Sequence, residues 1–349
     1  MIQSCIQKLI DGTNLSFNES TQIMQDIITG KTTCAQTSAL LTALRIKGET
    51  TAELVAFANV MKKQCIQIKP HVQSRLVDTC GTGGDRIKTF NVSTAAAFVI
   101  AGAGIPVAKH GNRAVTSKSG SADVLEKLGL NLAMTPQDVQ MAIEKIGVGF
   151  LFAPLFHPAL RIAMQPRKEI GIRTVFNLLG PLTNPTNAAG QLLGVYDSKL
   201  TVPLAKVLNT LGCREAMVVH GLDGLDEIST LGKTCIVHLK YGQINKLKVR
   251  PEFFGVKQAN ISDLKVLNVE ESAKIIQAIL LGKNLKDPKV ELVLVNSAAG
   301  IIVGGKADDF TEAMQIAKES ILSGAAFGKL KALISISGGN LQQFEELDA

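Results

Sequence analysis

Residues 78–94 decide the fold; they read Asp-Thr-Cys-Gly-Thr-Gly-Gly-Asp-Arg-Ile-Lys-Thr-Phe-Asn-Val-Ser-Thr. The short run at 75–78, apolar in its middle, is typical of a strand. The Ala-rich apolar run at 93–104 has the length of a helix and ends in glycines. The stretch between them is therefore a glycine turn that leads from a strand into the beginning of a helix.

The residues of this turn suit a phosphate group. Gly81, Gly83 and Gly84 let the backbone adopt positive φ and leave no Cβ between the chain and a ligand. Polar residues follow at the helix N-terminus, where unpaired N–H groups and the helix dipole favour an anion: Asn91, Ser93 and Thr94. An ordinary turn with Asn91 or Ser93 as N-cap is the alternative. The turn matches neither Gly-x-x-x-x-Gly-Lys-Ser/Thr nor Gly-x-Gly-x-x-Gly.

The composition is that of a globular protein. A length of 349 residues suggests about two domains, and the hydrophobic fraction is 46%. The 37 basic and 30 acidic residues give a net charge of +7, which suits an anionic substrate better than a nucleic acid. The six cysteines form no Cys-x-x-Cys pair, which indicates free thiols in a reducing compartment. With no signal-like start and no window of membrane-spanning length, we expect a soluble, cytoplasmic protein.

The chain before the glycine turn contains only helix patterns. Capping-box spacing occurs at Ser16 and Thr50, and Gly30 and Gly48 stand where helices should end. We therefore expect residues 1–70 to form a small helical domain, with one apolar face as a dimer contact.

Strand and helix patterns alternate after residue 75. The expected strands are 105–108, 148–152 and 216–220, with a polar hairpin at 234–240 and 244–249. The expected helices are 121–128, 136–146, 270–281, 290–303, 310–322 and 330–336, of which 290–303 also suits a buried strand. A helical stretch at 157–180 is interrupted by Pro166. This order predicts an α/β fold: a small all-helical N-terminal domain plus a larger α/β domain, residues 71–349, with a mostly parallel central sheet flanked by helices.

A second polar loop, residues 109–123, again follows a strand and precedes a helix. Loops that follow parallel strands meet at one edge of the sheet, so this loop should face the glycine turn. The alternative is a solvated loop in which Ser119 or Ser121 caps the next helix. The loop offers cations and hydroxyl groups to a phosphate: Lys109, Arg113, Lys118, Thr116, Ser117, Ser119 and Ser121.

An acidic pair and two arginines are further candidates for binding a metal ion and a carboxylate. Asp226 and Glu227, in a turn after a strand, suit Mg²⁺, although a solvated acidic turn would read the same way. Arg167 and Arg173 suit a bidentate grip on a carboxylate, with surface salt bridges as the alternative. The histidines lack zinc-ligand spacing, and only His110 lies in a loop of this kind.

Four strings together resemble the anthranilate phosphoribosyltransferase family, over nearly the whole chain and in the family's order. They are GTGGD (81–85), KTFNVST (88–94), KHGNR (109–113) with SGSADVLEKLG (119–129), and GIRTVFNLLGPLTNP (171–185). The Asp226-Glu227 pair falls where that family has its metal-binding Asp-Glu. Thr116-Ser117 stands where the family commonly has Ser-Ser, and it keeps both hydroxyls.

The resemblance implies transfer of phosphoribose from phosphoribosyl pyrophosphate (PRPP) to the amine of anthranilate, with release of pyrophosphate, in tryptophan biosynthesis. It implies anthranilate contacts at Gly81, Asn112 and Arg167, and two Mg²⁺ ions held by Ser93, Asp226 and Glu227. It implies PRPP contacts at Gly81, Gly84, Asp85, Thr89, Asn91, Val92, Ser93, Thr94, Lys109, His110, Gly111, Asn112, Arg113, Ala114, Val115, Thr116, Ser117 and Ser121. It also implies a homodimer that forms through the helical domain. Part of the segment at about 157–182 is expected to lie with this domain in space.

The implied chemistry needs no covalent nucleophile, because pyrophosphate is already a good leaving group when Mg²⁺ neutralises its charge. Positioning and electrostatic stabilisation carry the reaction, and His110 is only a weak candidate for a general base. Two other functions stay open on the residues alone: a pyrimidine nucleoside phosphorylase, which shares the fold, and a non-catalytic nucleic-acid-binding paralogue.

Overall fold

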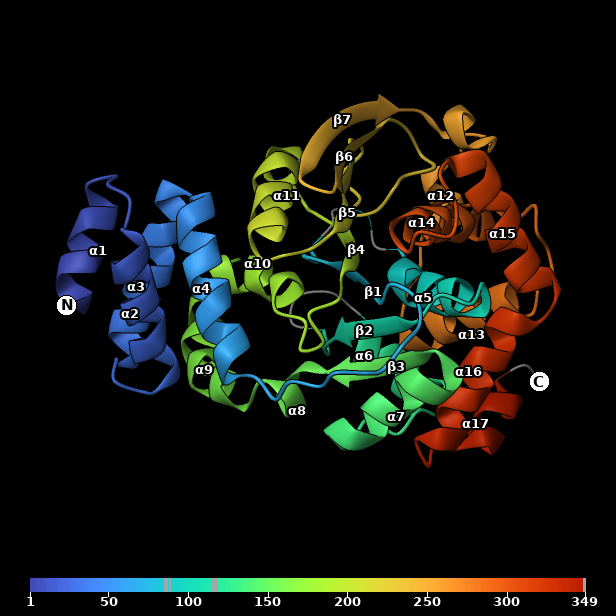
Figure 1. Cartoon of the computed structure of the whole chain (residues 1–349), viewed down its shortest axis with the longest axis horizontal. Helices are drawn as coiled ribbons and strands as arrows, with labels where there is room; N and C mark the ends of the chain where they lie inside the picture. The colour runs from blue at the N-terminus through green and yellow to red at the C-terminus, as the bar shows by residue number, and fades with distance from the viewer. Residues whose placement is uncertain (85–86, 88, 115–118, 348–349) are drawn as a thin grey trace.

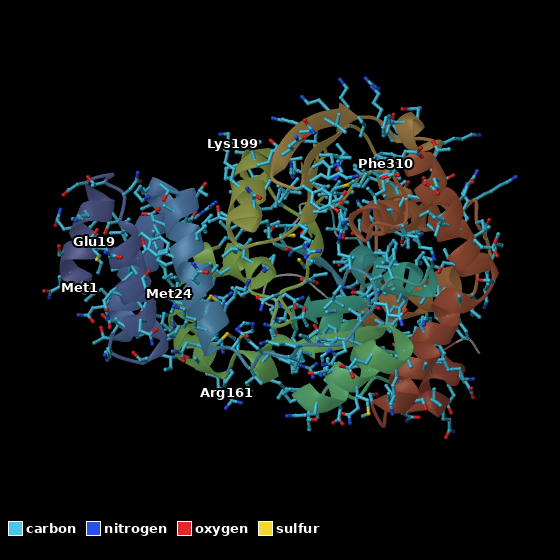
Figure 2. The ribbon with its side chains drawn as sticks, in the orientation of Figure 1. Met1, Glu19, Met24, Arg161, Lys199 and Phe310 are labelled. Atoms are coloured by element: carbon cyan, nitrogen blue, oxygen red, sulfur yellow. The ribbon has the colours of Figure 1, made fainter. Side chains whose placement is uncertain are left out.

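The computed structural model describes residues 1–84, 87, 89–114 and 119–347. The N-terminal part is a group of four helices, drawn in blue at the left of Figure 1: α1 (Ile2–Ile10), α2 (Phe17–Ile28), α3 (Cys34–Lys47) and α4 (Thr51–Gln64). Ser16 and Thr50 cap α2 and α4 through capping boxes, as the spacing predicted. Apolar faces at helical spacing hold the group together, and Met24 points into it while Glu19 lies at its outside (Figure 2).

One seven-stranded sheet lies at the centre of the rest of the chain, in the order β3-β2-β1-β4-β5-β6-β7. The strands from β3 to β5 are parallel, and β6 and β7 are antiparallel. Their bounds are β1 Val77–Gly81, β2 Val107–Gly111, β3 Val148–Phe152, β4 Gly190–Gly194, β5 Glu215–Gly221, β6 Thr234–Lys240 and β7 Gln243–Val249. The chain runs outward from β1 to β3 and then returns to β4 on the other side of β1. Ligands bind at such a reversal, at the carboxyl ends of the strands.

Helices cover both faces of the sheet (Figure 1). One face carries α5 (Val92–Gly102), α6 (Ser121–Lys127), α7 (Pro136–Ile146), α13 (Val269–Leu280), α14 (Pro288–Val303), α15 (Phe310–Leu322), α16 (Ala325–Ile336) and α17 (Leu341–Glu346). The other face carries α10 (Val175–Leu182), α11 (Thr201–Thr210) and, beyond them, the N-terminal helices. Successive strand residues point to opposite faces, so Leu192 joins the first core and Leu193 the second.

The segment between β3 and β4 connects the two parts of the molecule. It contains α8 (Ala153–Phe156), a 3₁₀ turn at Pro158–Leu160 and α9 (Arg161–Ile170), and α9 packs against α2 and α3. Short elements elsewhere are two more 3₁₀ turns, Ser198–Leu200 and Pro251–Phe254, and α12 (Ile261–Leu264). Within the described ranges no helix is both long and apolar enough to cross a bilayer.

The α/β architecture with a mostly parallel sheet confirms the fold predicted from the sequence, but several elements differ. No pattern in the sequence predicted β4 or α11. The apolar run at 290–303 is the helix that was expected there, and the alternative of a buried strand is wrong. Pro166 does not interrupt the helical stretch, because α9 continues through it.

Candidate active site

Two loops meet at the carboxyl edge of the parallel strands. The glycine turn leads from β1 into α5, and the second polar loop leads from β2 into α6. Because β1 and β2 are parallel neighbours, with Val77 paired to Val107, both loops leave the same edge. They line a single pocket of about 300 Å³, so the structure brings together the two loops that the sequence expected to face each other.

Most residues predicted to contact PRPP or the metal line this pocket: Gly81, Gly84, Thr89, Asn91, Val92, Ser93, Lys109, His110, Gly111, Asn112, Arg113, Ala114, Ser121, Asp226 and Glu227. Thr94 does not line it, because its side chain is fully buried in α5, where its hydroxyl has no partner among the described residues. Asp85, Val115, Thr116 and Ser117 lie outside the described part of the chain.

The polar side chains at the two helix entrances do not act as caps. Asn91 occupies the N-cap position of α5 but makes no side-chain cap bond, and its Nδ2 instead donates to the carbonyl oxygen of Ser119 at 3.2 Å. Ser93 Oγ accepts from Lys109 Nζ at 3.2 Å. The N-cap of α6 is Gly120, so neither serine of the second loop caps that helix. Asn91 thus occupies the N-cap position that the alternative gave it, but its side chain does not make the hydrogen bond of an ordinary cap.

Lys109 is a buried cation beneath the pocket. Its Nζ donates to the Thr79 carbonyl oxygen at 2.6 Å as well as to Ser93. Burial lowers the pKa of this amine, and the carboxylates of Asp78 and Glu227 oppose that shift because they favour its charged form. A phosphate bound beside Lys109 would stabilise the same charged form.

An acidic turn after β5 forms another wall. Asp226 Oδ2 accepts a hydrogen bond from the Gly83 N–H at 3.0 Å. A Cβ on Gly81 would lie 2.7 Å from that oxygen, and a side chain at Gly194 would overlap the Asp226 backbone, so the close approach requires both glycines. Burial raises the pKa of the Asp226 carboxyl above its usual value, which marks a carboxylate short of positive charge.

The pocket offers donors of the kind that Mg²⁺ prefers. Ser93 presents a hydroxyl, and Asp226 and Glu227 present carboxylates. Mg²⁺ takes one or two carboxylates and completes its shell with water and phosphate oxygens. In the described ranges no three His, Cys, Asp or Glu side chains converge as a metal site. The buried Asp226 carboxylate therefore fits this metal.

Arg113 is held by acidic residues of α6. Its Nη1 lies 2.7 Å from Glu126 and 3.0 Å from Asp123, and these hydrogen bonds, the Glu126 one foremost, raise the pKa of the guanidinium. Asp123 also accepts from the backbone N–H groups of Ala114 and Gly120, at 2.9 Å each. The two ends of the second loop are thus fastened to the first turn of α6.

The structure does not bring Arg167 into the pocket lining. Its guanidinium lies over the Phe176 ring, 5.3 Å from the centroid, and burial lowers its pKa. Burial is the only cause of this shift, and no charged or hydrogen-bonded partner among the described residues contributes to it. Asn177, next to Phe176, lines the pocket. Arg167 is therefore a half-buried cation outside the pocket lining, and no described charged group shifts its pKa.

Arg173 also differs from the expected carboxylate grip. Its Nη2 donates to the Gly84 carbonyl oxygen, and its guanidinium stacks 4.4 Å from the Tyr196 ring centroid. Tyr196 in turn accepts a hydrogen bond from Arg45 of α3 at 3.0 Å. These residues border a second cavity of about 350 Å³ behind the glycine turn.

His110 is a neutral imidazole in the pocket wall. Its Nδ1 lies 3.2 Å from the Gly180 carbonyl oxygen, which can only accept, so Nδ1 carries the hydrogen. Nε2 is buried without a partner among the described residues. Burial lowers the pKa of His110 to about 3, helped by His157, whose ring centroid is 5.1 Å away. A group with this pKa is a poor general base at neutral pH.

Sequence reasoning missed one wall of the pocket. Val266 and Asn268, from the segment between α12 and α13, line it together with the two loops. Thr89 in the glycine turn forms an isolated antiparallel bridge with Lys265 of this segment. The segment carries no glycine, no cluster of hydroxyls and no acidic pair next to a strand, so no local pattern could have found it.

Comparison with known proteins gives the class first. Residues 3–65 match the family described as "Glycosyl transferase family, helical bundle domain", and residues 73–327 match "Glycosyl transferase family, a/b domain". The chain is thus a glycosyl transferase of the kind that joins a helical bundle to an α/β domain.

Individual relatives narrow the class. The chain is 49% identical to the anthranilate phosphoribosyltransferase of Methanocorpusculum labreanum, over 97% of this chain and 99% of the relative. The crystal structure of the enzyme of that name from Thermus thermophilus superposes with a TM-score of 0.89 at 38% identity, over 96% of this chain and 99% of that one. The Saccharomyces cerevisiae enzyme in complex with PRPP and Mg gives a TM-score of 0.87 at 29% identity, over 97% and 98%. The chain belongs to the anthranilate phosphoribosyltransferase family.

Proposed function

We propose that this chain transfers the 5-phosphoribosyl group of PRPP to the amine of anthranilate and releases pyrophosphate, a step of tryptophan biosynthesis. The observation that carries the proposal is the pocket itself. Two phosphate-type loops, a buried lysine and an acidic turn face one cavity at the carboxyl ends of β1, β2 and β5.

The two loops would hold the sugar and its phosphates. Lys109 supplies a buried positive charge and Ser93 a hydroxyl, while the start of α5 adds the favourable end of a helix dipole. The full set we propose for PRPP is Gly81, Gly84, Asp85, Thr89, Asn91, Val92, Ser93, Thr94, Lys109, His110, Gly111, Asn112, Arg113, Ala114, Val115, Thr116, Ser117 and Ser121. Thr94 would act through its backbone, because its side chain is buried in α5.

Ser93, Asp226 and Glu227 would hold Mg²⁺, and we propose two ions per site. Bound Mg²⁺ neutralises the charge that develops on the departing pyrophosphate. Replacing both acids, in an Asp226→Asn, Glu227→Gln variant, should lower turnover by at least about a hundredfold at saturating Mg²⁺, because the pocket loses both carboxylates. Undiminished activity would remove these residues from the metal site.

Anthranilate would bind at Gly81, Asn112 and Arg167. Gly81 and Asn112 line the pocket, and Arg167 is the half-buried cation over the Phe176 ring, where a carboxylate would supply a counter-charge. The amine would then face the ribose carbon that loses pyrophosphate. The chain supplies position and electrostatic stabilisation, and no covalent nucleophile is needed.

We further propose that residues 1–70, with part of about 157–182, move as one domain against the remainder of residues 71–349. Closure would exclude water, which otherwise competes with the amine for the sugar. The helical domain would also carry the contact of a homodimer, and we propose a cytoplasmic location.

One assay tests the reaction directly. Anthranilate is fluorescent, so its signal should fall after PRPP is added in the presence of Mg²⁺, and should persist when EDTA is added first. Phosphorolysis of thymidine in the presence of phosphate is the control reaction and should not occur. A stable anthranilate signal with PRPP and Mg²⁺ would overturn the proposed function.

A further inference from the structure

A serine far away in the sequence is hydrogen-bonded to the start of α5. Ser272, in the first turn of α13, is fully buried. Its Oγ accepts from the backbone N–H of Asn91 at 3.2 Å and donates to Asn91 Oδ1 at 2.9 Å. The Ser272 hydroxyl thus makes two hydrogen bonds to the same pocket residue, one as donor and one as acceptor.

The orientation of the Asn91 amide follows from its hydrogen bond to Ser119. Nδ2 lies 3.2 Å from the carbonyl oxygen of Ser119, and a carbonyl can only accept, so the nitrogen must face it. Oδ1 then receives the Ser119 hydroxyl at 2.8 Å and the Ser272 hydroxyl at 2.9 Å. One side chain therefore connects the glycine turn, the second loop and α13.

The surroundings of Ser272 point to the same site. Asn268 and Val266, just before it in the chain, line the pocket, and Lys265 bridges to Thr89. The start of α13 and the segment before it are thereby fixed against the end of the glycine turn that leads into α5. Without the Ser272 hydroxyl, the Asn91 N–H would lose its partner and the amide would keep only its bonds to Ser119.

We propose that Ser272 is a positioning residue for the phosphoribosyl pyrophosphate site: it holds Asn91 in the orientation that binds the substrate. The proposal rests on the proposed function, in which Asn91 contacts PRPP. Ser272 itself does not line the pocket, so its effect must pass through Asn91.

The central experiment is a double-mutant cycle read out by PRPP affinity. Ser272→Ala should raise the KM for PRPP about fivefold or more, while kcat and the anthranilate KM change less than twofold, because one hydrogen-bonded restraint on a binding group is lost. In an Asn91→Ala background the same replacement should change the PRPP KM by less than twofold. An equal effect in both backgrounds would overturn the proposal.

Ser320→Ala is the matched control. Ser320 is also a buried serine on a helix that packs against α5. Its hydroxyl donates to the Val99 carbonyl oxygen of α5 at 2.7 Å, away from the pocket. It should lower the melting temperature about as much as Ser272→Ala and leave the PRPP KM within twofold of the parent value. A Ser272→Ala variant that loses stability but keeps its PRPP KM would show that Ser272 is only structural.

Two further measurements keep the outcomes distinct. Calorimetric titration of the unmodified protein with PRPP and Mg²⁺ tests the proposed function alone, and absence of binding there would end both proposals. If Ser272→Ala does not fold, Ser272→Cys fills nearly the same space with a weak donor. It should show a raised dissociation constant for PRPP, and a value equal to that of the parent would contradict the role of Ser272.

Discussion

Individual charged side chains around the pocket are buried without the partners that would fully satisfy them. Burial lowers the pKa of Lys109 and raises that of Asp226, so each charged form is disfavoured by its surroundings. A ligand that brings phosphates and a divalent cation supplies the opposite charge to both. Shifts of this kind in a cleft are typical of functional sites.

Replacing Arg167 by alanine should raise the anthranilate KM by about tenfold or more, because a charge-assisted pair with the substrate carboxylate is lost. The PRPP KM should stay within about twofold. Steady-state kinetics with each substrate varied in turn would measure both. Arg161→Ala on the same helix, where the side chain points to solvent (Figure 2), is the control and should change neither constant. An unaltered anthranilate KM in the Arg167 variant would exclude the carboxylate role.

His157 should make the protein sensitive to mild acid. Burial lowers its pKa from 6.5 to about 4, so at intermediate pH the unfolded chain binds a proton that the folded chain does not. Stability is therefore unaffected by this group above about pH 7 and falls as the pH drops through 6.5 towards 4.

We expect the free energy of unfolding of both proteins to fall when the pH is lowered from 7 to 5. In a His157→Asn variant this fall should be about 2 kcal/mol smaller than in the parent. Urea unfolding at the two pH values measures the difference. The parent and variant should respond equally between pH 7 and pH 8, where the histidine is neutral in both states. Parallel acid dependence of parent and variant would contradict the buried, neutral state of His157.

At the scale of secondary-structure elements, the glycine turn depends on neighbours from three places in the chain. Tyr196, just after β4, donates its backbone N–H to Thr82 Oγ1 at 3.1 Å and stacks on Arg173, which binds the Gly84 carbonyl. The Arg45 hydrogen bond adds a helix of the N-terminal group. The turn is thus connected to α3 through an aromatic side chain.

Tyr196→Ala should raise the PRPP KM by about fivefold to tenfold, because the Arg173 guanidinium loses its stacking surface and the Gly84 carbonyl its fixed partner. Tyr241→Ala is the matched control: Arg75 stacks on that ring at 5.9 Å and hydrogen-bonds its hydroxyl at 3.1 Å, far from the pocket. Steady-state kinetics should show a raised KM for PRPP in the Tyr196 variant only. Equal KM values in the two variants would show that Tyr196 does not support the glycine turn.

The sequence predicted elements well where a single local pattern decided them. The strand Val148–Phe152 and the helices Phe310–Leu322 and Pro136–Ile146 have the expected bounds, because a short apolar run marks the strand and N-cap residues mark the starts of the helices. The strand Gly190–Gly194 was missed since it has glycine at both ends, which is typical of a turn. Those glycines are explained only by distant neighbours: a Cβ at Gly194 would overlap the Asp226 backbone.

In the candidate site, too, local motifs predicted some residues, whereas others depend on tertiary contacts. Glycines, hydroxyls and paired acids next to strands were visible as motifs, and the order of parallel strands predicted that their loops would meet. The contribution of Ser272 was not visible, because it comes from a tertiary contact across 181 positions. The position of Arg167 over Phe176 likewise depends on how α9 packs, which no local pattern gives.

At the scale of the whole molecule, the sheet separates two cores, and only one of them extends into the N-terminal helices. Those helices nevertheless leave large apolar side chains in water: Ile46 is 82% exposed and Ile10 66%. Other large apolar side chains, such as Leu267 and Leu322, are exposed elsewhere, so Ile10 and Ile46 are chosen because the proposed dimer contact lies on their helices. We therefore expect the proposed homodimer to bury this part of the molecule.

Light scattering during gel filtration should give a mass about twice the 37.1 kDa of one chain. An Ile10→Glu, Ile46→Glu variant should shift the protein towards the monomer, because two charges would have to be buried without partners. Leu322→Glu, at a 61% exposed position of α15, is the control and should leave the mass unchanged. A parent protein that is monomeric at micromolar concentration would contradict the dimer, whereas a dimer that tolerates both charges would place its interface away from these side chains. Since the pocket is built within one chain, the monomeric variant should still bind PRPP.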